Sequence, residues 1–163
     1  MLDKRKFYIN GRWVEPKKPN DFNVINPCNE DPCAIISLGS KEDTNAAIKS
    51  AKNAFETWKE TTKEDRLNYL EKLLSVYKKR SREMAEAISL EMGAPMDWAT
   101  EVQTASGQLH LEDFILRLKD FEFDEHFNKK SNNHICYEPI GVCGLITPWN
   151  WPINQIALKV IPA

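Results

Sequence analysis

The stretch GVCGLITPWNWPINQIALKVIPA, residues 141–163, is the most informative part of this 163-residue chain for its fold class. Its first part, GVCGLIT (141–147), is continuously apolar, which indicates a parallel strand covered on both faces rather than a half-exposed one. Pro148 cannot donate to a strand ladder, and Pro152 suits the first turn of a helix, where its missing N–H would be unpaired anyway. Apolar residues then recur at helical spacing, namely Ile153, Ile156, Ala157, Val160 and Ile161. The segment therefore predicts a strand, a turn and a helix of an α/β fold with a parallel sheet.

The predicted turn consists of Trp149, Asn150 and Trp151, beyond the carboxyl end of the strand and at the amino terminus of the helix. Open α/β sheets bind ligands at this position, where backbone N–H groups favour negative charge. Aimed at a carbonyl oxygen, the amide of Asn150 would stabilise the alkoxide that forms under nucleophilic attack, an effect of about 3 kcal/mol. Asparagine is also a common helix N-cap. Spacing alone therefore leaves two roles open for Asn150, and capping is the more frequent of them.

The amino-terminal part of the chain predicts a small β layer. FYINGRWV (7–14) contains Asn-Gly between aromatic and β-branched residues, the strongest short signal for a two-residue hairpin. A second extended stretch, FNVIN (22–26), runs into Pro27, and a third, CAIISL (33–38), ends at Gly39.

Helical patterns follow, and the first begins after an N-cap signal at 40–43. Its apolar stripe consists of Ala47, Ala51, Ala54, Phe55 and Trp58. The second helix begins at 61–64, with Glu64 placed to complete a capping box, and the basic cluster KKRSR (78–82) is expected near its end. Its stripe consists of Leu67, Leu70, Leu74 and Tyr77.

Two further helices are predicted between residues 82 and 119. The third spans about 82–92 and stops at Gly93, a natural residue for a left-handed position after a helix. Pro95 fits the first turn of the fourth, which runs to about Lys119. The stripe of the fourth helix consists of Trp98, Val102, Ala105, Leu109 and Leu116. We expect the large aromatic side chains of these helices to lie in the core.

Composition and charge exclude several functional classes. The chain has 22 basic and 24 acidic residues and a net charge of −2, so no basic excess indicates nucleic acid or an anionic membrane as a partner. The amino terminus lacks the apolar stretch of a secretory signal, and no apolar run approaches the roughly 18 residues of a membrane span, so the expected location is the cytoplasm. Cysteines and histidines fall in no metal-ligand spacing, and no metal site is expected. They are Cys28, Cys33, Cys136, Cys143, His110, His126 and His134.

The chain resembles the aldehyde dehydrogenase superfamily over essentially its whole length. PWNWP (148–152) is the most specific match, and FYINGRWV, FNVINP, AAIKSAKNAFETW and EMGAP agree with the family upstream. The resemblance implies an α/β fold in three parts. These are a β-hairpin and helical part of the cofactor-binding domain (1–120), oligomerisation-type strands (121–139), and the first strand–turn–helix of an incomplete, parallel, Rossmann-like sheet (140–163).

The same resemblance implies the chemistry. The asparagine of the motif, here Asn150, helps form the oxyanion hole for a thiohemiacetal, and the residues before it line the site of a nicotinamide cofactor, NAD or NADP. Those residues are Ile146, Thr147, Pro148 and Trp149. In the family reaction a cysteine thiolate attacks a small-molecule aldehyde, a hydride passes to the cofactor, and a glutamate-activated water hydrolyses the thioester to a carboxylic acid. The family also implies a homo-oligomer, either a dimer or a tetramer.

The family's nucleophilic cysteine, general-base glutamate and glycine-rich cofactor turn lie downstream of the motif, and no cysteine here stands in the nucleophile's context. We therefore expect this chain to be the amino-terminal portion of such an enzyme, inactive by itself and with an exposed apolar stripe at Ile153, Ile156 and Val160. Two alternatives stay open. One is a non-catalytic short partner that assembles with full-length subunits, and the other is a CoA-acylating enzyme, in which a thiol replaces the hydrolytic water.

Overall fold

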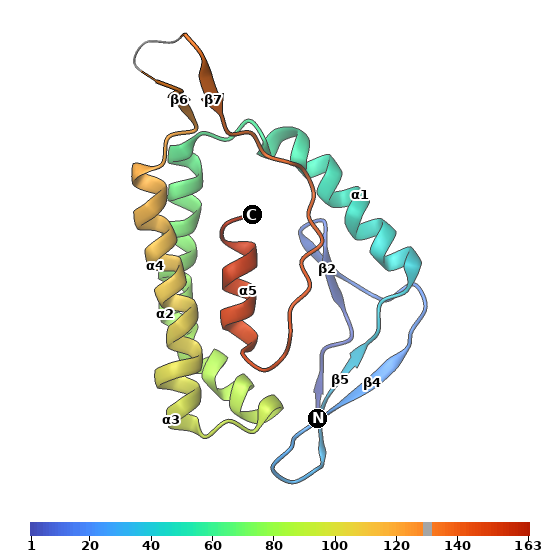
Figure 1. Cartoon of the computed structure of the whole chain (residues 1–163). Helices are drawn as coiled ribbons and strands as arrows, with labels where there is room; N and C mark the ends of the chain where they lie inside the picture. The colour runs from blue at the N-terminus through green and yellow to red at the C-terminus, as the bar shows by residue number, and fades with distance from the viewer. Residues whose placement is uncertain (129–131) are drawn as a thin grey trace.

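A β layer, a group of helices and a protruding hairpin make up the chain, of which the computed structural model describes residues 1–128 and 132–163 (Figure 1). The larger sheet of the β layer has the strand order β1–β5–β4. β1 (Leu2–Asp3) pairs in parallel with β5 (Pro32–Ser37), and β4 (Asp21–Ile25) pairs with β5 in the antiparallel direction. The two extended stretches predicted ahead of the helices are therefore strands.

The predicted amino-terminal hairpin is confirmed. β2 (Phe7–Ile9) and β3 (Arg12–Val14) pair in the antiparallel direction across a two-residue turn. Asn10 and Gly11 both lie in the left-handed region, with φ of 53° and 72°. This is the backbone that a type I′ turn requires at both central positions, and it explains why Asn-Gly occurs here.

α1 (Lys41–Trp58) begins where the sequence predicts. The hydroxyl of Ser40 accepts a hydrogen bond from the backbone N–H of Asp43, and Asp43 Oδ2 accepts one from the backbone N–H of Ser40, at 3.2 and 2.9 Å. Asp43 Oδ1 also accepts from the backbone N–H of Lys17 at 2.9 Å. The carboxylate therefore ties the start of the helix to the loop that follows the β2–β3 hairpin.

α2 (Lys63–Met92) also begins with a capping box, but one residue later than predicted. The N-cap is Thr62, and its partner is Asp65, so the assignment of that role to Glu64 is wrong. Gly93 ends the helix in the left-handed conformation, with φ of 74°, as the sequence predicts.

The interior of α2 contradicts the predicted break near residue 82, because the helix continues through it for 30 residues. The basic cluster at 78–82 lies mid-helix, where Arg80 pairs with Glu83 and Arg82 pairs with Glu86. Such pairs at helical spacing support the helix, and no glycine or proline interrupts it before Gly93. The basic residues therefore mark an exposed face rather than an end.

The next helical stretch has three parts: α3 (Met96–Trp98), the π-helical turn η1 (Ala99–Thr104) and α4 (Ala105–Asp120). They follow one another without a gap, so the predicted fourth helix is confirmed in extent. Pro95 occupies its N-cap position.

The face that this stretch buries differs from the predicted one. Leu109 and Leu116 of the predicted stripe are each 63% exposed. The buried residues are instead Ala99, Gln103, Thr104, Gly107, Leu111 and Ile115. A π turn spaces equivalent positions further apart than an α-helix does. The predicted stripe is out of register from its first residue, however, because Trp98 is 47% exposed and the next residue, Ala99, is fully buried.

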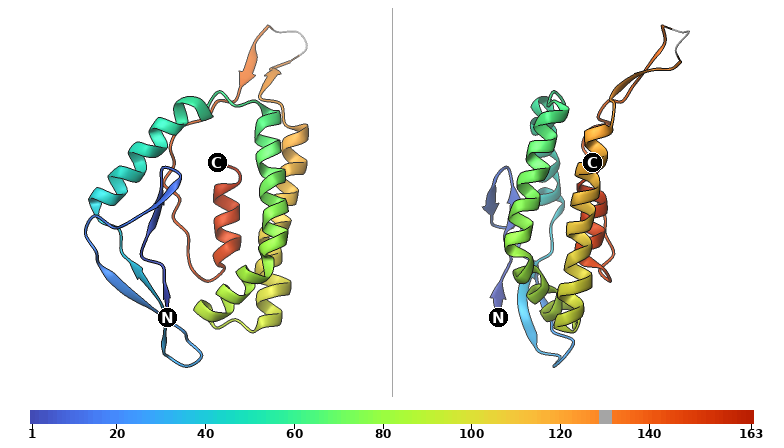
Figure 2. Two further views of the ribbon diagram at one scale, coloured as in Figure 1. Left: turned by 180° about the vertical axis from the view of Figure 1, so that it is seen from behind. Right: turned by 90° about the vertical axis from the view of Figure 1, so that its left-hand side faces the viewer.

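The core lies where α2, η1 and α5 (Pro152–Val160) meet, beside the short link that follows α2. Its buried members are Ala85, Ile88, Ala94 and Ala99, and Met84, Met92 and Ile153 pack against them. The alanines allow the helices to approach closely. Figure 2 shows α2 and α4 side by side, and α5 packs against α4 and η1.

The second hairpin projects from the end of the helices, as both views in Figure 2 show. Its strands are β6 (Asp124–His126) and β7 (His134–Cys136), which pair in the antiparallel direction. Extended structure is therefore present within 121–139, whereas its predicted role in oligomerisation stays a prediction. Part of the turn predicted at 131–134 lies outside the described residues, since 129–131 are not described.

The segment from 137 to 151 leads from β7 to α5, and none of it is a strand in the described structure. The buried strand predicted at 141–147 is therefore wrong for this chain, and Ile140 and Ile146 are 95% and 87% exposed. A parallel strand needs hydrogen-bonding strands beside it. The strands of the described residues all belong to the amino-terminal layer or to the hairpins, so the apolar segment finds no such neighbour.

No helix in the described ranges combines the length and the apolar character that crossing a lipid bilayer requires.

Candidate functional site

The turn that leads into α5 contains the residues to which the sequence assigns a site. Trp151 occupies the N-cap position with φ of −140° and ψ of 70°, and no side chain caps the helix. Pro152 is the first helical residue, as predicted. The first turn of α5 therefore presents backbone N–H groups that are not taken up by a capping side chain, a common feature of anion-binding helix termini.

Asn150 lies one residue before the N-cap, and its side chain is exposed. Within the described residues it takes part in no hydrogen bond. The alternative role as a helix cap is therefore wrong in this structure. The amide is left able to donate to a ligand.

The predicted cofactor residues form one continuous exposed segment directly before Asn150. Ile146 and Trp149 are 87% and 80% exposed, and Thr147 and Pro148 between them are exposed as well. The structure thus brings these residues together with Asn150 through chain continuity. Their surface is largely apolar and has one hydroxyl.

Two side-chain contacts from α3 and α4 support the turn, and the sequence did not predict them. The ring of Trp151 packs edge-on against Trp98 of α3, with 6.1 Å between centroids and 65° between planes. His110 Nε2 and Asn154 Oδ1 are 2.7 Å apart and join α4 to α5. These two residues are 44 positions apart, so no local spacing could have linked them.

Polar groups are also buried within η1. Tyr77 Oη donates a hydrogen bond to the carbonyl of Thr104 at 2.7 Å, and burial raises the pKa of Tyr77 to about 12, so the phenol stays protonated. Gln103 and Thr104 are 1% and 2% exposed. Among the described residues, Gln103 Oε1 and Thr104 Oγ1 have no hydrogen-bond partner. The π turn therefore places buried polar side chains next to α5.

The thiols of this chain lie in environments that differ from that of Asn150. Cys33 Sγ donates to the carbonyl of Val24 at 3.3 Å, and burial together with nearby carboxylates raises the pKa of Cys136, the opposite of activation. Cys143 lines a cavity of about 670 Å³ that also includes the carboxyl-terminal end of α5. A nine-residue helix is about 13 Å long, which separates that end from the turn at its start. No hydrogen bond among the described residues joins a thiol to Asn150.

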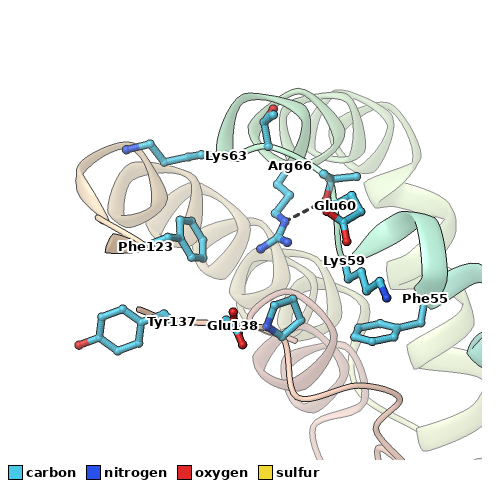
Figure 3. Close-up of a pocket in the computed structure, with 11 residues that line it drawn as sticks. Phe55, Lys59, Glu60, Lys63, Arg66, Phe123, Tyr137 and Glu138 are labelled. Atoms are coloured by element: carbon cyan, nitrogen blue, oxygen red, sulfur yellow. Dashed lines mark hydrogen bonds between the residues drawn. The ribbon is translucent and has the colours of Figure 1, made fainter. Parts of the chain in front are cut away.

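A second cavity, of about 510 Å³, lies where α1, α2 and the base of the β6–β7 hairpin meet (Figure 3). Arg66 points into it, with its Nε donating to Thr61 Oγ1 at 3.0 Å and its guanidinium carbon 5.3 Å from the centre of the Phe123 ring. None of the predicted site residues lines either cavity. Arg66 thus joins the hairpin to the helices.

The β6–β7 hairpin carries the remaining cluster of metal-binding residue types. Asp124 faces Cys136 and His126 faces His134 across the strands, and His134 Nδ1 lies 2.6 Å from Asp124 Oδ1. In the described part of the chain, no three His, Cys, Asp or Glu side chains are placed so that they could hold a metal ion.

The structure thus combines α/β architecture with a helix amino terminus that no side chain caps and an exposed amide beside it. Residues 13–163 match the aldehyde dehydrogenase family, and the chain belongs to that family.

Relatives of known name agree with this assignment. The chain is 43% identical to 3-succinoylsemialdehyde-pyridine dehydrogenase of a Pseudomonas species, over all of this chain and 34% of that protein. Aldehyde dehydrogenase from Bartonella henselae is 53% identical with a TM-score of 0.97, over 99% of this chain and 34% of the other. Aldehyde dehydrogenase C of Pseudomonas syringae, solved with NAD⁺ and octanal, is 38% identical with a TM-score of 0.93, over 97% of this chain and 32% of the other. The chain therefore spans about one third of the length of these relatives.

Proposed function

We propose that this chain works as the amino-terminal third of an enzyme that oxidises a small aldehyde to a carboxylic acid with NAD⁺ or NADP⁺. Family membership supports the reaction class, and the NAD⁺ and octanal in the Pseudomonas syringae structure support the cofactor and the substrate class. The observation that carries the proposal is the exposed Asn150, without a hydrogen bond in the described residues, beside the uncapped start of α5.

Asn150 acts in this proposal as the donor to the aldehyde oxygen. When a cysteine thiolate attacks the carbonyl carbon to form a thiohemiacetal, the C=O π electrons move onto that oxygen as an alkoxide. The side-chain amide of Asn150 donates to the alkoxide, and the free N–H groups of the first α5 turn add positive potential. The nucleophile is a cysteine other than the four of this chain, because none of them contacts Asn150 in the described structure.

The segment before Asn150 holds the nicotinamide end of the cofactor. Ile146 and Trp149 offer exposed apolar surface that a flat ring can cover, next to the amide that meets the carbonyl oxygen. NAD⁺ or NADP⁺, when bound, accepts the hydride from the substrate carbon. Residues 146–149 thus bind the cofactor, and the next residue, Asn150, binds the aldehyde oxygen.

Assembly and location complete the proposal. The β6–β7 hairpin joins a neighbouring subunit in a dimer or tetramer, since its strands project away from the helices (Figure 1). We place the enzyme in the cytoplasm. By itself the 163-residue polypeptide is not expected to oxidise aldehydes, because no thiol in the described contacts reaches Asn150.

Substitution of Asn150 tests the proposed role. The enzyme carrying this chain is prepared from its own gene or as a chimera in which the chain replaces the matching third of the Bartonella henselae protein. In Asn150→Ala we expect kcat to fall by about 10²- to 10³-fold, as for loss of one oxyanion donor, with Kd for NAD⁺ changed by less than about 3-fold. Steady-state kinetics and cofactor titration measure both.

A matched control is Asn53→Ala, an exposed asparagine on α1 that should leave both constants unchanged. An unchanged kcat in Asn150→Ala would exclude the oxyanion role. The product distinguishes the two reactions, since a hydrolytic enzyme forms the free acid, whereas a CoA-acylating enzyme forms a thioester only when CoA is added.

A further inference from the structure

The first turn of α5 is held chiefly from one side. The main contacts of α5 are with α4 and η1, whereas the segment that enters the turn from β7 forms no strand and is largely exposed. Whatever fixes the orientation of α5 on η1 and α4 therefore also fixes the position of Asn150.

Part of this support is apolar. Trp151 packs on Trp98, and Ile153 lies so close to Gly107 that a Cβ there would be 2.9 Å from Ile153 Cγ1. Apolar contacts of this kind keep two helices together but are non-directional. They oppose separation of α5 from α4 more than they oppose a small rotation or slide.

The hydrogen bond between His110 and Asn154, unlike the apolar contacts, is directional. His110 donates from its Nε2–H to Asn154 Oδ1 at 2.7 Å, and both side chains are half-buried. A hydrogen bond weakens steeply when its angle or length changes, so it selects one rotation of α5 against α4. Asn154 is the third residue of α5, and Asn150 directly precedes the N-cap of the same helix. A shift at Asn154 is therefore passed directly to the turn.

We infer that His110 is a positioning residue, whose hydrogen bond to Asn154 fixes the orientation of α5 and thereby aims the amide of Asn150. This inference rests on the oxyanion role proposed above. A displacement of about 1 Å at a reacting group can lower a rate by up to 10²-fold, so a contact in the first turn of α5 is close enough to matter.

The first experiment compares two substitutions of His110 in the enzyme that carries this chain. His110→Leu removes the donor, and we expect kcat to fall about 10-fold while Kd for NAD⁺ changes less than 2-fold. His110→Gln keeps an amide N–H at nearly the distance of Nε2, so we expect it to retain kcat within about 3-fold of the unsubstituted enzyme. A glutamine variant as impaired as the leucine variant would contradict a role based on this hydrogen bond.

The decisive experiment repeats His110→Leu in an Asn150→Ala background. If His110 acts by aiming the Asn150 amide, its loss should cause less than about a 2-fold further decrease in kcat once the amide is gone. A residue that only stabilises the fold would lower kcat by the same factor in both backgrounds. Equal factors would therefore overturn the inference.

The outcomes separate this inference from the proposed function. If Asn150→Ala has the unsubstituted kcat, the oxyanion role fails and His110 has nothing to position. If Asn150→Ala is impaired but His110→Leu is not, the inference alone fails. Should His110→Leu not fold, Asn154→Ala removes the acceptor instead, and the same two expectations apply to it.

Discussion

At the scale of single residues, two glycines with nearly the same backbone conformation have very different surroundings. Gly93 ends α2 with φ of 74°, and Gly11 closes the β2–β3 turn with φ of 72°. A Cβ on Gly93 would lie 2.8 Å from Cγ of Pro27, whereas nothing lies within 4 Å of a Cβ on Gly11. A side chain at either glycine would therefore strain the backbone, but only a side chain at Gly93 would also overlap a neighbouring residue.

Gly93→Ala should accordingly destabilise the protein more than Gly11→Ala does. The left-handed conformation costs about 1–2 kcal/mol for an alanine at either position. Overlap with the Pro27 ring adds about 1–3 kcal/mol at Gly93, as for other overpacked sites. Thermal unfolding of both variants measures the difference, and equal decreases in Tm would show that the Pro27 contact relaxes without cost.

At the scale of elements, the start of α1 depends on one carboxylate. Asp43 accepts hydrogen bonds from the backbone N–H of Lys17 and from the N–H and hydroxyl of Ser40, at 2.9, 2.9 and 2.7 Å. The Lys17 N–H, followed by the Ser40 donors, lowers the pKa of Asp43 from its ordinary value of 3.8. Because the folded state favours the ionised form, this stabilisation is complete above the ordinary pKa. It is lost as the pH falls through the lower, folded-state pKa.

Asp43→Asn should therefore flatten the acid side of the stability profile. We expect the unsubstituted protein to lose stability as the pH falls below about 4, and the asparagine variant, which cannot titrate there, to lose less. Asp65→Asn in the exposed capping box of α2 is the comparison: Thr62 also lowers the pKa of Asp65, but in the described structure no donor from outside the box reaches this carboxylate, so we expect a smaller flattening than for Asp43→Asn. Urea unfolding between pH 7 and pH 3 provides the measurement. Profiles of Asp43→Asn and the unsubstituted protein that run parallel would contradict the assignment.

At the scale of the whole molecule, features set by local chemistry were predictable from the sequence, and features set by distant partners were not. Asn10-Gly11, Ser40 and Pro152 fix a turn, a helix start and a helix entry through their own backbone preferences, and all three lie where predicted. The strand expected at 141–147 depends on neighbouring strands, and without them the segment stays exposed.

The candidate site also has a part that local sequence predicts and a part that depends on distant residues. The turn with Asn150 follows from two prolines and an apolar helix pattern, all within a short stretch. The hydrogen bond between His110 and Asn154 depends on how α4 packs against α5, and that packing depends on the π turn η1. The buried face begins with small or polar residues, Ala99, Gln103 and Thr104, which a search for large apolar residues at helical spacing does not find. The contacts between α4 and α5 could therefore not be predicted.

Exposed apolar side chains lie on α5 and around the cavity at its carboxyl-terminal end. Of the predicted α5 stripe, Ile153 packs against the core, whereas Ile156 and Val160 are 44% and 54% exposed. Val160 also lines the cavity of about 670 Å³, together with aromatic side chains such as Trp58 and Tyr69, which are themselves 43% and 59% exposed. The expectation that large aromatics of the helices are core residues is wrong for these two and for Trp98, which is 47% exposed. Contiguous apolar surface of this kind favours association.

The 163-residue polypeptide, expressed by itself, should therefore self-associate and bind a hydrophobic dye. Val160→Glu places a charge in the apolar cavity and should lower both dye binding and the sedimentation mass. Leu116→Glu is the matched control, because Leu116 is 63% exposed on α4 and does not line that cavity, so it should change neither. A polypeptide that sediments as a monomer and leaves the dye unbound would show that these side chains cover one another in solution.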